Sequence, residues 1–563
     1  MSANRLGGNG RQADDRSLSR RQVLRTGGVG LAAAGLAAAG VGRVGAQGTT
    51  TVLRRSAPAA GGQATPVPSA PLGEVNAAGV ALAVEKLPAV AHDILGRTGV
   101  PGMAVAVVFD DTVRFVGGFG VRELDTGAPV TADTVFQLAS VSKSLAATVV
   151  ASVVGTGEVA WTSRLSDLDP AFALHDAWPT QEVTLADLFS HRSGLPDHGG
   201  DLLEDLGFDR ETILHRLRFL EPEYSFRGDY AYTNFGPTAA ATAAARAAGV
   251  TWEDLSDERL YKPLAMTATS SRFAEYMARE DRAAPHVRRS GQWQLTPIQR
   301  DPDPESPAGG VSSSANDLAT WMRLQLGQGT LAGKELIPKA ALAPVHTPQS
   351  VSRSPADPAT QRAGFYGLGT NVGYTDFGMP QWSHSGAFAL GAGTCYYLLP
   401  AAGFGVVALT NGQPVGAAES LALTVLDLAQ GVEDGRDWLE VVGPAFDAMN
   451  APTYGADSDW TTAPVGATSA LANESYTGTY QNAFFGDVEV AARGDGLVLR
   501  IGPAPLEFPL THFDRDTFTW QPTGENAYGL SGLTFVVEGD KASGFRDQYL
   551  ASGGPGDLAR KEV

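Results

Sequence analysis

The chain has 563 residues, of which 43% are hydrophobic and 18% charged, and this length and composition predict a globular protein of two or more domains. From residue 47 onward it carries 35 basic and 59 acidic residues. So acidic a surface argues against binding to nucleic acid or to anionic membranes. The single cysteine, Cys395, has no partner for an intrachain disulfide and is expected to be a small core residue in a strand.

Residues 1–46 are predicted to be a signal peptide of the twin-arginine type. Ser19-Arg-Arg-Gln-Val-Leu-Arg25 resembles the twin-arginine export motif, an Ala/Gly/Val/Leu stretch follows, and Val44-Gly-Ala46 offers small residues for cleavage. The apolar stretch is short, so stable membrane insertion after cleavage is not expected. We therefore expect export to the periplasm, the cell surface or the medium, with residues 47–76 as a Pro/Ala/Thr-rich linker.

Residues 77–437 are predicted to form the first folded domain. A helical pattern runs from about residue 78 to 97, and two strand-like runs follow, joined by a hairpin turn at Asp110-Asp111. Residues 140 to about 320 are mostly helix and loop, and strands return between residues 364 and 411. This order predicts an α+β fold: one antiparallel sheet built from both ends of the domain, with helix layers, a helical lobe and a cleft between lobe and sheet.

The C-terminal part has a different pattern. Residues 438–472 contain a stretch rich in Ala, Pro, Thr, Gly and Ser and are predicted to be a second linker. Residues 473–563 show short alternating runs separated by turn residues, which favours a small all-β barrel or sandwich.

Ser140-Val-Ser-Lys143 is the most informative motif for chemistry. Lys143 is one of seven lysines, and none of the others has a serine three residues before it. Positions i and i+3 share one face of a helix, so the amine would lie over the Ser140 hydroxyl. A hydroxyl becomes a good nucleophile when a neighbouring base takes its proton, and burial among apolar side chains favours the neutral amine that can do so. The alternative is a surface serine and lysine on an ordinary helix.

Other motifs follow in a fixed order. Tyr232-Thr-Asn234 comes next, then His384-Ser-Gly386, with Ser193-Gly-Leu-Pro196 and Gly309-Gly-Val-Ser-Ser-Ser314 at their flanks. Together they resemble the serine β-lactamase and penicillin-binding-protein superfamily over about residues 80–430. The closest resemblance is to its class C-like branch of D-peptidases, esterases and β-lactamases. Tyr476-Thr-Gly-Thr-Tyr480 resembles the lipocalin-like β-domain appended to some members.

The resemblance implies roles for five residues. Ser140 would be the acylated nucleophile and Lys143 its proton acceptor. Tyr232 would be a second proton carrier held near Lys143, whose positive charge favours tyrosinate. Asn234 would hydrogen-bond Lys143 or a substrate carbonyl. The fifth position, His384, departs from β-lactamases of this superfamily, which carry a lysine there to receive a substrate carboxylate. A histidine is mostly neutral at pH 7, which makes esters or peptides more favourable substrates than β-lactams.

The resemblance also implies an oxyanion hole and a substrate-binding strand. The backbone N–H groups of Ser140 and Ala387 would stabilise the tetrahedral intermediate. Gly386 would let a substrate backbone lie close along the strand.

Metal and cofactor chemistry are not expected. His191 and His198 lie near each other in sequence, but no H-E-x-x-H motif and no cysteine cluster accompanies them. His191 is interpreted as a structural residue at a helix end, and no G-x-S-x-G motif is present.

The sequence thus predicts an exported serine hydrolase that acts on a small-molecule ester, peptide or cell-wall-like substrate. Within the enzyme class, a class C-like β-lactamase or a penicillin-binding carboxypeptidase stays open. From another class, a non-catalytic cell-wall- or ligand-binding protein on the same scaffold is the alternative. The sequence leaves the oligomeric state open.

Overall fold

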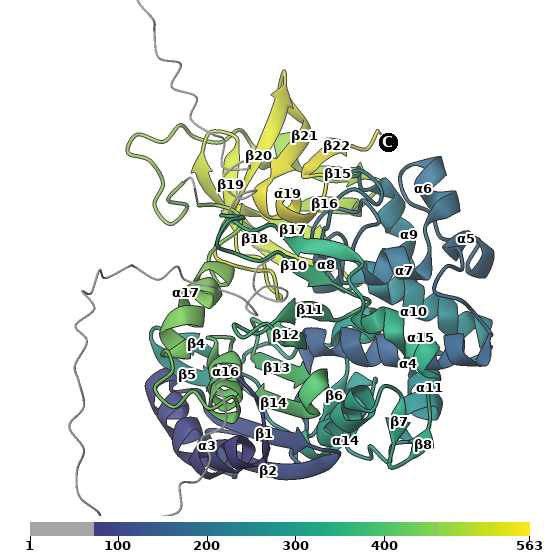
Figure 1. Cartoon of the computed structure of the whole chain (residues 1–563). Helices are drawn as coiled ribbons and strands as arrows, with labels where there is room; N and C mark the ends of the chain where they lie inside the picture. The colour runs from purple at the N-terminus through teal and green to yellow at the C-terminus, as the bar shows by residue number, and fades with distance from the viewer. Residues whose placement is uncertain (1–72, 457, 563) are drawn as a thin grey trace, which may run out of the picture.

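The computed structural model describes residues 73–456 and 458–562, and the chain folds into a large α+β part and a small closed barrel (Figure 1). The predicted signal peptide and all but the last four residues of the predicted 47–76 linker lie outside the described residues. The α+β part and the barrel pack against each other, so the barrel has direct contacts with the helical lobe.

The α+β part is organised around an eight-stranded antiparallel sheet, as the sequence predicts. Its strand order is β2-β1-β14-β13-β12-β11-β10-β9, so strands from both ends of the domain meet at its centre. Asp110 and Asp111, each with φ of 52°, form the tight turn between β1 and β2. The strands are β1 (Gly102–Phe109), β2 (Thr112–Gly120), β9 (Ser350–Arg353), β10 (Gly364–Tyr366), β11 (Asn371–Tyr374), β12 (Pro380–Phe388), β13 (Ala392–Leu399) and β14 (Phe404–Thr410).

Helices cover both faces of this sheet, which explains why its central strands are apolar without alternation. Alternate residues of β1 face opposite layers: Met103 packs towards α3 (Ala77–Thr98) and α16 (Ala417–Ala429), and Ala104 towards α4 (Ser142–Thr156) and α14 (Ala315–Leu326). Cys395 is buried in the α3/α16 layer, as expected for a core residue.

The helical lobe lies between β3 (Phe136–Gln137) and the strands of the C-terminal half. Its helices are short, and most of its length is loop. They are α5 (Leu165–Leu168), α6 (Ala177–Glu182), α7 (Leu185–Phe189), α8 (Asp201–Asp205), α9 (Arg210–Arg216), α10 (Phe235–Ala247), α11 (Trp252–Ser256), α12 (Phe273–Ala278), α13 (Ser306–Gly309) and α15 (Lys339–Leu342). Three small two-stranded sheets complete it: β3 with β6 (Ser312–Ser313), β4 (His286–Arg289) with β5 (Gln292–Leu295), and β7 (Thr330–Leu331) with β8 (Lys334–Glu335).

The predicted 438–472 linker begins with a helix, so the linker boundary at residue 438 is wrong. Helix α17 (Trp438–Met449) packs on α16 and buries Trp438, Val442 and Phe446. Its apolar spacing is helical, and Asp437 caps its N-terminus through the Leu439 N–H group. The α+β part therefore extends to about residue 449.

The C-terminal part is a closed eight-stranded antiparallel barrel, which confirms the predicted all-β barrel. Its interior holds a cluster of aromatic rings that includes Tyr476, Tyr480 and Phe535. The strands are β15 (Gly478–Asn482), β16 (Gly486–Arg493), β17 (Gly496–Ile501), β18 (Leu506–Asp514), β19 (Thr517–Trp520), β20 (Ser531–Glu538), β21 (Lys541–Asp547) and β22 (Asp557–Arg560), with the short helices α18 (Asn473–Tyr476) and α19 (Gln548–Gly553) beside them.

One helical stretch in the described residues, 139–156, is long and apolar enough to cross a membrane. Most of it is buried between the sheet and the lobe, where an apolar sequence on all sides is expected of a central core helix. It carries both Ser140 and Lys143.

Candidate active site

Ser140 lies in a short 3₁₀ turn, η2 (Ala139–Val141), that leads into α4. Ala139 has φ of 48°, a left-handed conformation that costs free energy for a residue with a side chain. Ala139 packs with Phe388 and Ala392, at the end of β12 and the start of β13. These contacts hold the strained turn against the sheet and leave Ser140 partly exposed.

Lys143 is fully buried one turn further along α4, below Ser140. Its Nζ lies 3.2 Å from Ser140 Oγ, and it donates to Asn234 Oδ1 at 2.6 Å and to the Ala308 carbonyl at 3.1 Å. Burial lowers the pKa of Lys143 to about 8, although the nearby charge of Glu305 opposes the shift. The amine is therefore much closer to neutrality at physiological pH than an exposed lysine and is placed to accept the serine proton.

Asn234, at the N-terminus of α10, connects Lys143 to two groups of the lobe. Its Nδ2 donates to Asp201 Oδ2 at 2.9 Å, and the same carboxylate oxygen lies 2.8 Å from His198 Nδ1. The carboxylate raises the pKa of His198 against the opposing effect of burial. The sequence predicts the contact between Asn234 and Lys143 but not the part of Asp201, whose acidic side chain lies in no recognised motif.

Tyr232 is next to the serine–lysine pair, where burial opposes the tyrosinate that the charge of Lys143 would favour. Its ring centroid is 4.6 Å from Lys143 Nζ, and Ser140 is close enough to lower the hydroxyl's pKa. Burial nevertheless raises the pKa of Tyr232 well above its usual value, because charge on a buried oxygen is poorly solvated. Apart from Ser140, the hydroxyl has no hydrogen-bond partner among the described residues, so burial favours the neutral phenol.

Gly386 lies on β12 directly against the nucleophile turn, and this contact gives a reason for a glycine in addition to the expected substrate contact. A side-chain carbon there would lie 2.1 Å from the Leu138 carbonyl, 2.4 Å from Thr394 Oγ1 and 3.1 Å from the Ser140 nitrogen. The absent side chain lets Thr394 Oγ1 donate to Leu138 O at 2.7 Å. Ala387, one residue further, is partly exposed beside Ser140, where its N–H group can belong to the same site.

His384 is buried on β12 and already satisfied by the protein. Its Nε2 lies 2.8 Å from the Tyr366 hydroxyl and its Nδ1 2.7 Å from the Ser385 carbonyl oxygen. Burial lowers the pKa of His384 to about 3, with a further contribution from the charge of Lys143. The ring is therefore neutral, as expected, but its two nitrogens are bound to protein groups.

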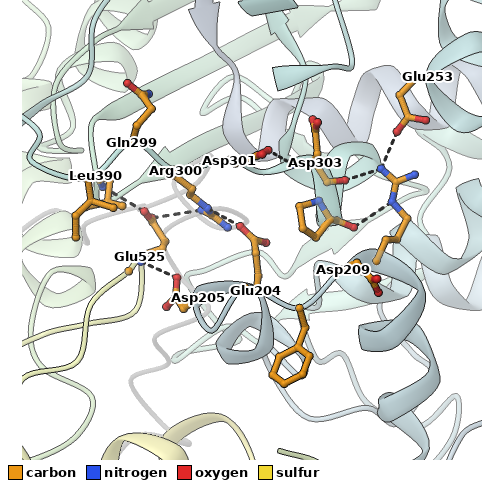
Figure 2. Close-up of a pocket in the computed structure, with 16 residues that line it drawn as sticks. Glu204, Asp205, Asp209, Glu253, Gln299, Arg300, Asp301, Asp303, Leu390 and Glu525 are labelled. Carbon is orange, nitrogen blue, oxygen red and sulfur yellow. Dashed lines mark hydrogen bonds and ion pairs between the residues drawn. The ribbon is translucent and has the colours of Figure 1, made fainter. Parts of the chain in front are cut away.

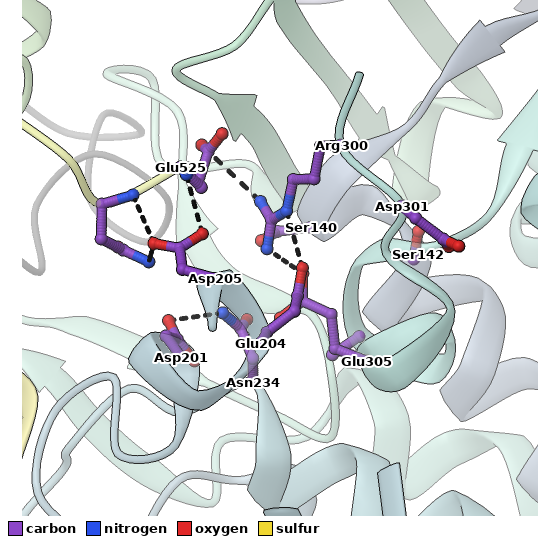
Figure 3. Close-up of polar contacts among 12 residues, drawn as sticks. Ser140, Ser142, Asp201, Glu204, Asp205, Asn234, Arg300, Asp301, Glu305 and Glu525 are labelled. Carbon is purple, nitrogen blue, oxygen red and sulfur yellow. Dashed lines mark hydrogen bonds and ion pairs between the residues drawn. The ribbon is translucent and has the colours of Figure 1, made fainter. Parts of the chain in front are cut away.

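A set of charged residues beside Lys143 lies in no motif. Arg300 is almost fully buried and pairs with Glu204 and Glu305, each at 2.8 Å, and with Glu525 of the barrel at 3.6 Å (Figure 3). Burial raises the pKa of Glu305 to about 7 despite the opposing charge of Arg300. Arg300 and Glu305 are close in sequence, but Glu204 and Glu525 reach them only through long-range contacts, so no local pattern marks the set.

His191 packs against the ring of Tyr232 with centroids 4.6 Å apart, which agrees with its interpretation as a structural residue. Its Nδ1 accepts the Thr233 N–H at 3.1 Å, which holds the Tyr232 segment in place. Within residues 73–456 and 458–562, no three His, Cys, Asp or Glu side chains are arranged to hold a metal ion.

Comparison with known proteins places this geometry in a family context. Residues 83–430 match the family described as Beta-lactamase, and residues 462–550 match a domain of unknown function, DUF3471. The first match covers more than half of the chain and contains Ser140, Lys143, Tyr232, Asn234 and His384.

Three relatives illustrate the range of similar proteins. Penicillin-binding protein 4 of Amycolatopsis lactamdurans is 28% identical over 56% of this chain and 81% of its own length. The unguisins hydrolase ungD' of Aspergillus campestris is 27% identical over 57% of this chain and 60% of its own length. The octameric penicillin-binding protein homologue of Pyrococcus abyssi superposes with a TM-score of 0.55 over 85% of this chain and all of its own, at 18% identity, which supports the fold.

Proposed function

The chain belongs to the beta-lactamase family of serine hydrolases, and from this premise we propose that it forms an acyl-enzyme on Ser140 and hydrolyses esters or amides. The observation that carries the proposal is the placement of Lys143 Nζ 3.2 Å from Ser140 Oγ in a buried site that lowers the amine's pKa to about 8. A base within hydrogen-bond distance and with a pKa near the working pH is what activation of a serine requires.

In the proposed acylation, neutral Lys143 takes the proton of Ser140 as Oγ bonds to the substrate carbonyl carbon. The carbonyl oxygen becomes an oxyanion, which the N–H groups of Ser140 and Ala387 would stabilise; such donors typically contribute ~10²–10³ in rate each. The bond to the leaving group then breaks, and the leaving oxygen or nitrogen takes a proton. In deacylation, water gives a proton to the site's base and attacks the acyl carbonyl carbon. The bond to Ser140 Oγ then breaks, Oγ takes a proton, and the acid product is released.

Tyr232 is the proposed donor of the leaving-group proton. Burial favours its neutral phenol and its hydroxyl lies beside Ser140, which suits a group that gives a proton and regains it from the Lys143 ammonium. Asn234 holds Lys143 in place through its 2.6 Å hydrogen bond.

Esters and peptides without a carboxylate beside the scissile bond are the proposed substrate class. His384 takes the position of the carboxylate-binding lysine, is neutral, and is occupied by Tyr366 and Ser385. One relative, AmpH of Escherichia coli, is named as a D-alanyl-D-alanine-carboxypeptidase/endopeptidase. The endopeptidase part of that name supports peptide bonds within the range, whereas a carboxypeptidase substrate carries a carboxylate beside the scissile bond. β-Lactam hydrolysis of the class C type is the alternative within the enzyme class.

A non-catalytic binding protein on this scaffold is less favoured. Loss of catalysis would leave no physical reason to keep a buried lysine aimed at an exposed serine, because a buried amine destabilises the fold unless its hydrogen bonds are satisfied. A panel of aryl esters, D-amino acid peptides and a chromogenic cephalosporin would distinguish these functions. No turnover of any of them, together with no reaction with a fluorophosphonate, would contradict the proposed function.

We also propose that the protein acts outside the cytoplasm after twin-arginine export. The support is the Arg20-Arg21 pair, the apolar stretch and the small residues near Ala46. Replacing both arginines by lysine should trap precursor in the cytoplasm, and N-terminal sequencing of the exported form should begin near Gln47. Export that is unaffected by the double change would contradict this proposal.

A further inference from the structure

A loop of the barrel contacts the turn that follows Ala387 of the candidate active site. The loop joins β19 to β20, and Asp205 of helix α8 holds it: Asp205 accepts the Glu525 N–H at 2.8 Å and the Asn526 N–H at 2.9 Å. The Tyr549 hydroxyl of the barrel donates to the same carboxylate at 3.2 Å. The loop is therefore docked on the helical lobe by several hydrogen bonds and not by a single flexible contact.

The Glu525 side chain continues from this anchor to the sheet. Its two carboxylate oxygens accept the N–H groups of Ala389 at 2.5 Å and Leu390 at 3.2 Å. These residues form the turn between β12 and β13, two and three residues after Ala387, and the carboxylate is 12% exposed. Hydrogen bonds to a carboxylate are stronger than those between neutral groups, so Glu525 fixes where this turn lies.

Arg300 provides a second connection from the barrel to the nucleophile. Its guanidinium lies 3.6 Å from Glu525 and its carbon is 4.1 Å from the centroid of the Phe388 ring. Phe388 in turn packs on Ala139, the residue before Ser140. Figure 2 shows Glu525, Arg300 and Glu204 converging on one side of a cavity of about 620 Å³ between the lobe and the barrel loop.

We propose that Glu525 of the barrel is a positioning residue for acylation, which fixes the β12–β13 turn and thereby the oxyanion-binding segment next to Ser140. The proposal rests on the proposed serine hydrolase function of the same site. It gives the C-terminal barrel a part in catalysis, although every motif residue lies in the α+β part.

The physical reason is the sensitivity of an oxyanion hole to position. The N–H of Ala387 must point at the developing charge, and a misplacement of about 1 Å can reduce the rate ~10²-fold. Without Glu525 the Ala389 and Leu390 N–H groups lose their acceptor. The effect should fall on the acylation rate and kcat, since Glu525 does not touch Ser140.

The test uses the full chain with Glu525→Ala or Glu525→Gln, and Glu538→Ala as the matched control on an exposed end of β20. The readouts are the second-order rate of fluorophosphonate labelling at Ser140 and kcat and KM for an aryl ester. Glu525→Ala should label about tenfold or more slowly, mainly through kcat, by the sensitivity above. Glu525→Gln should lie between it and wild type, because its amide oxygen keeps one acceptor without the charge. Glu538→Ala should match wild type.

Each outcome decides a different claim. Wild-type chain that is never labelled overturns the proposed function itself. If wild type is labelled, and Glu525→Ala and Glu525→Gln are folded by circular dichroism and are labelled at the wild-type rate, the positioning role alone is overturned. If Glu525→Ala does not fold, the isosteric Glu525→Gln decides: a rate equal to wild type contradicts the proposal, and a reduced kcat at unchanged KM supports it.

Discussion

Lys143 donates to Asn234 Oδ1 at 2.6 Å, a shorter distance than the 3.2 Å to Ser140 Oγ. The Asn234 amide cannot turn over, because its nitrogen donates to Asp201, which as a carboxylate only accepts. The lysine is therefore held by a fixed acceptor on one side while its amine faces the serine on the other. This contact fixes the position of the candidate base, whereas burial is the main cause of its lowered pKa.

Lys143→Met should remove the base while nearly keeping the side-chain volume. A general base typically contributes ~10²–10⁴ in rate, and a fall of that size in kcat/KM is expected.

For the wild-type enzyme, kcat/KM should rise with pH and level off above about 8, because the neutral amine is the reactive form and burial lowers the pKa of Lys143 to about 8. A flat profile between pH 6 and 9, or a Lys143→Met enzyme of normal activity, would refute this role.

Asp201→Asn should move the acidic limb of the same pH profile to lower pH. The Asp201 charge favours the Lys143 ammonium, so removing it should lower the pKa of Lys143 further below its ordinary value. The new amide can still accept from Asn234. Asp487→Asn, at an exposed ion pair of the barrel, serves as the control and should leave the limb in place. If the acidic limb of the kcat/KM profile shifts to higher pH in the Asp201→Asn variant, a group other than Lys143 controls the limb.

Gly386→Ala should damage the site much more than an alanine elsewhere. The added carbon would lie 2.1 Å from the Leu138 carbonyl, so the nucleophile turn or β12 must move. We expect labelling of Ser140 to slow by about a hundredfold, the effect of losing one oxyanion donor. Gly96→Ala in α3, where nothing lies within 4 Å, should leave labelling unchanged and stabilise the fold by about 0.4–1 kcal/mol. Equal labelling rates for both variants would be inconsistent with the close contact.

Esters or short peptides should be turned over with higher kcat/KM than a chromogenic cephalosporin at pH 7.5. A neutral, occupied His384 gives no charge to a substrate carboxylate, and the missing charge-assisted hydrogen bond should cost about 1–2 kcal/mol. Lowering the pH to 6 should not favour the cephalosporin, since burial lowers the pKa of His384 to about 3. A cephalosporin that is turned over faster than every ester and peptide would restore the β-lactamase alternative.

The sequence predicts most of the fold and the central pair of the site because both depend on local spacing. Ser140 and Lys143 are one helical turn apart, and Asp110-Asp111 marks its hairpin by composition alone. For Tyr232 the sequence indicates the neighbouring charge of Lys143, which favours tyrosinate, but no motif reveals the burial that raises the pKa of the phenol. Arg300 and Glu525 are 225 positions apart, and only folding brings them together.

The linker error has a similar cause. Pro444 and the small residues that follow Met449 make the segment resemble a linker, whereas tertiary packing of Trp438 and Phe446 on α16 stabilises helix α17. Helix α17 is stabilised by its packing against α16, and the local sequence does not reveal that contact.

The most direct test of the account is the site of covalent labelling. The full chain is treated with a fluorophosphonate, digested and mapped by mass spectrometry, with Ser140→Ala in parallel. The account predicts one adduct, on the peptide that contains Ser140, and none in the Ser140→Ala chain, which should unfold at the same temperature as wild type because the change removes a single partly exposed oxygen. An adduct on another residue, or labelling that persists without the Ser140 hydroxyl, would contradict it.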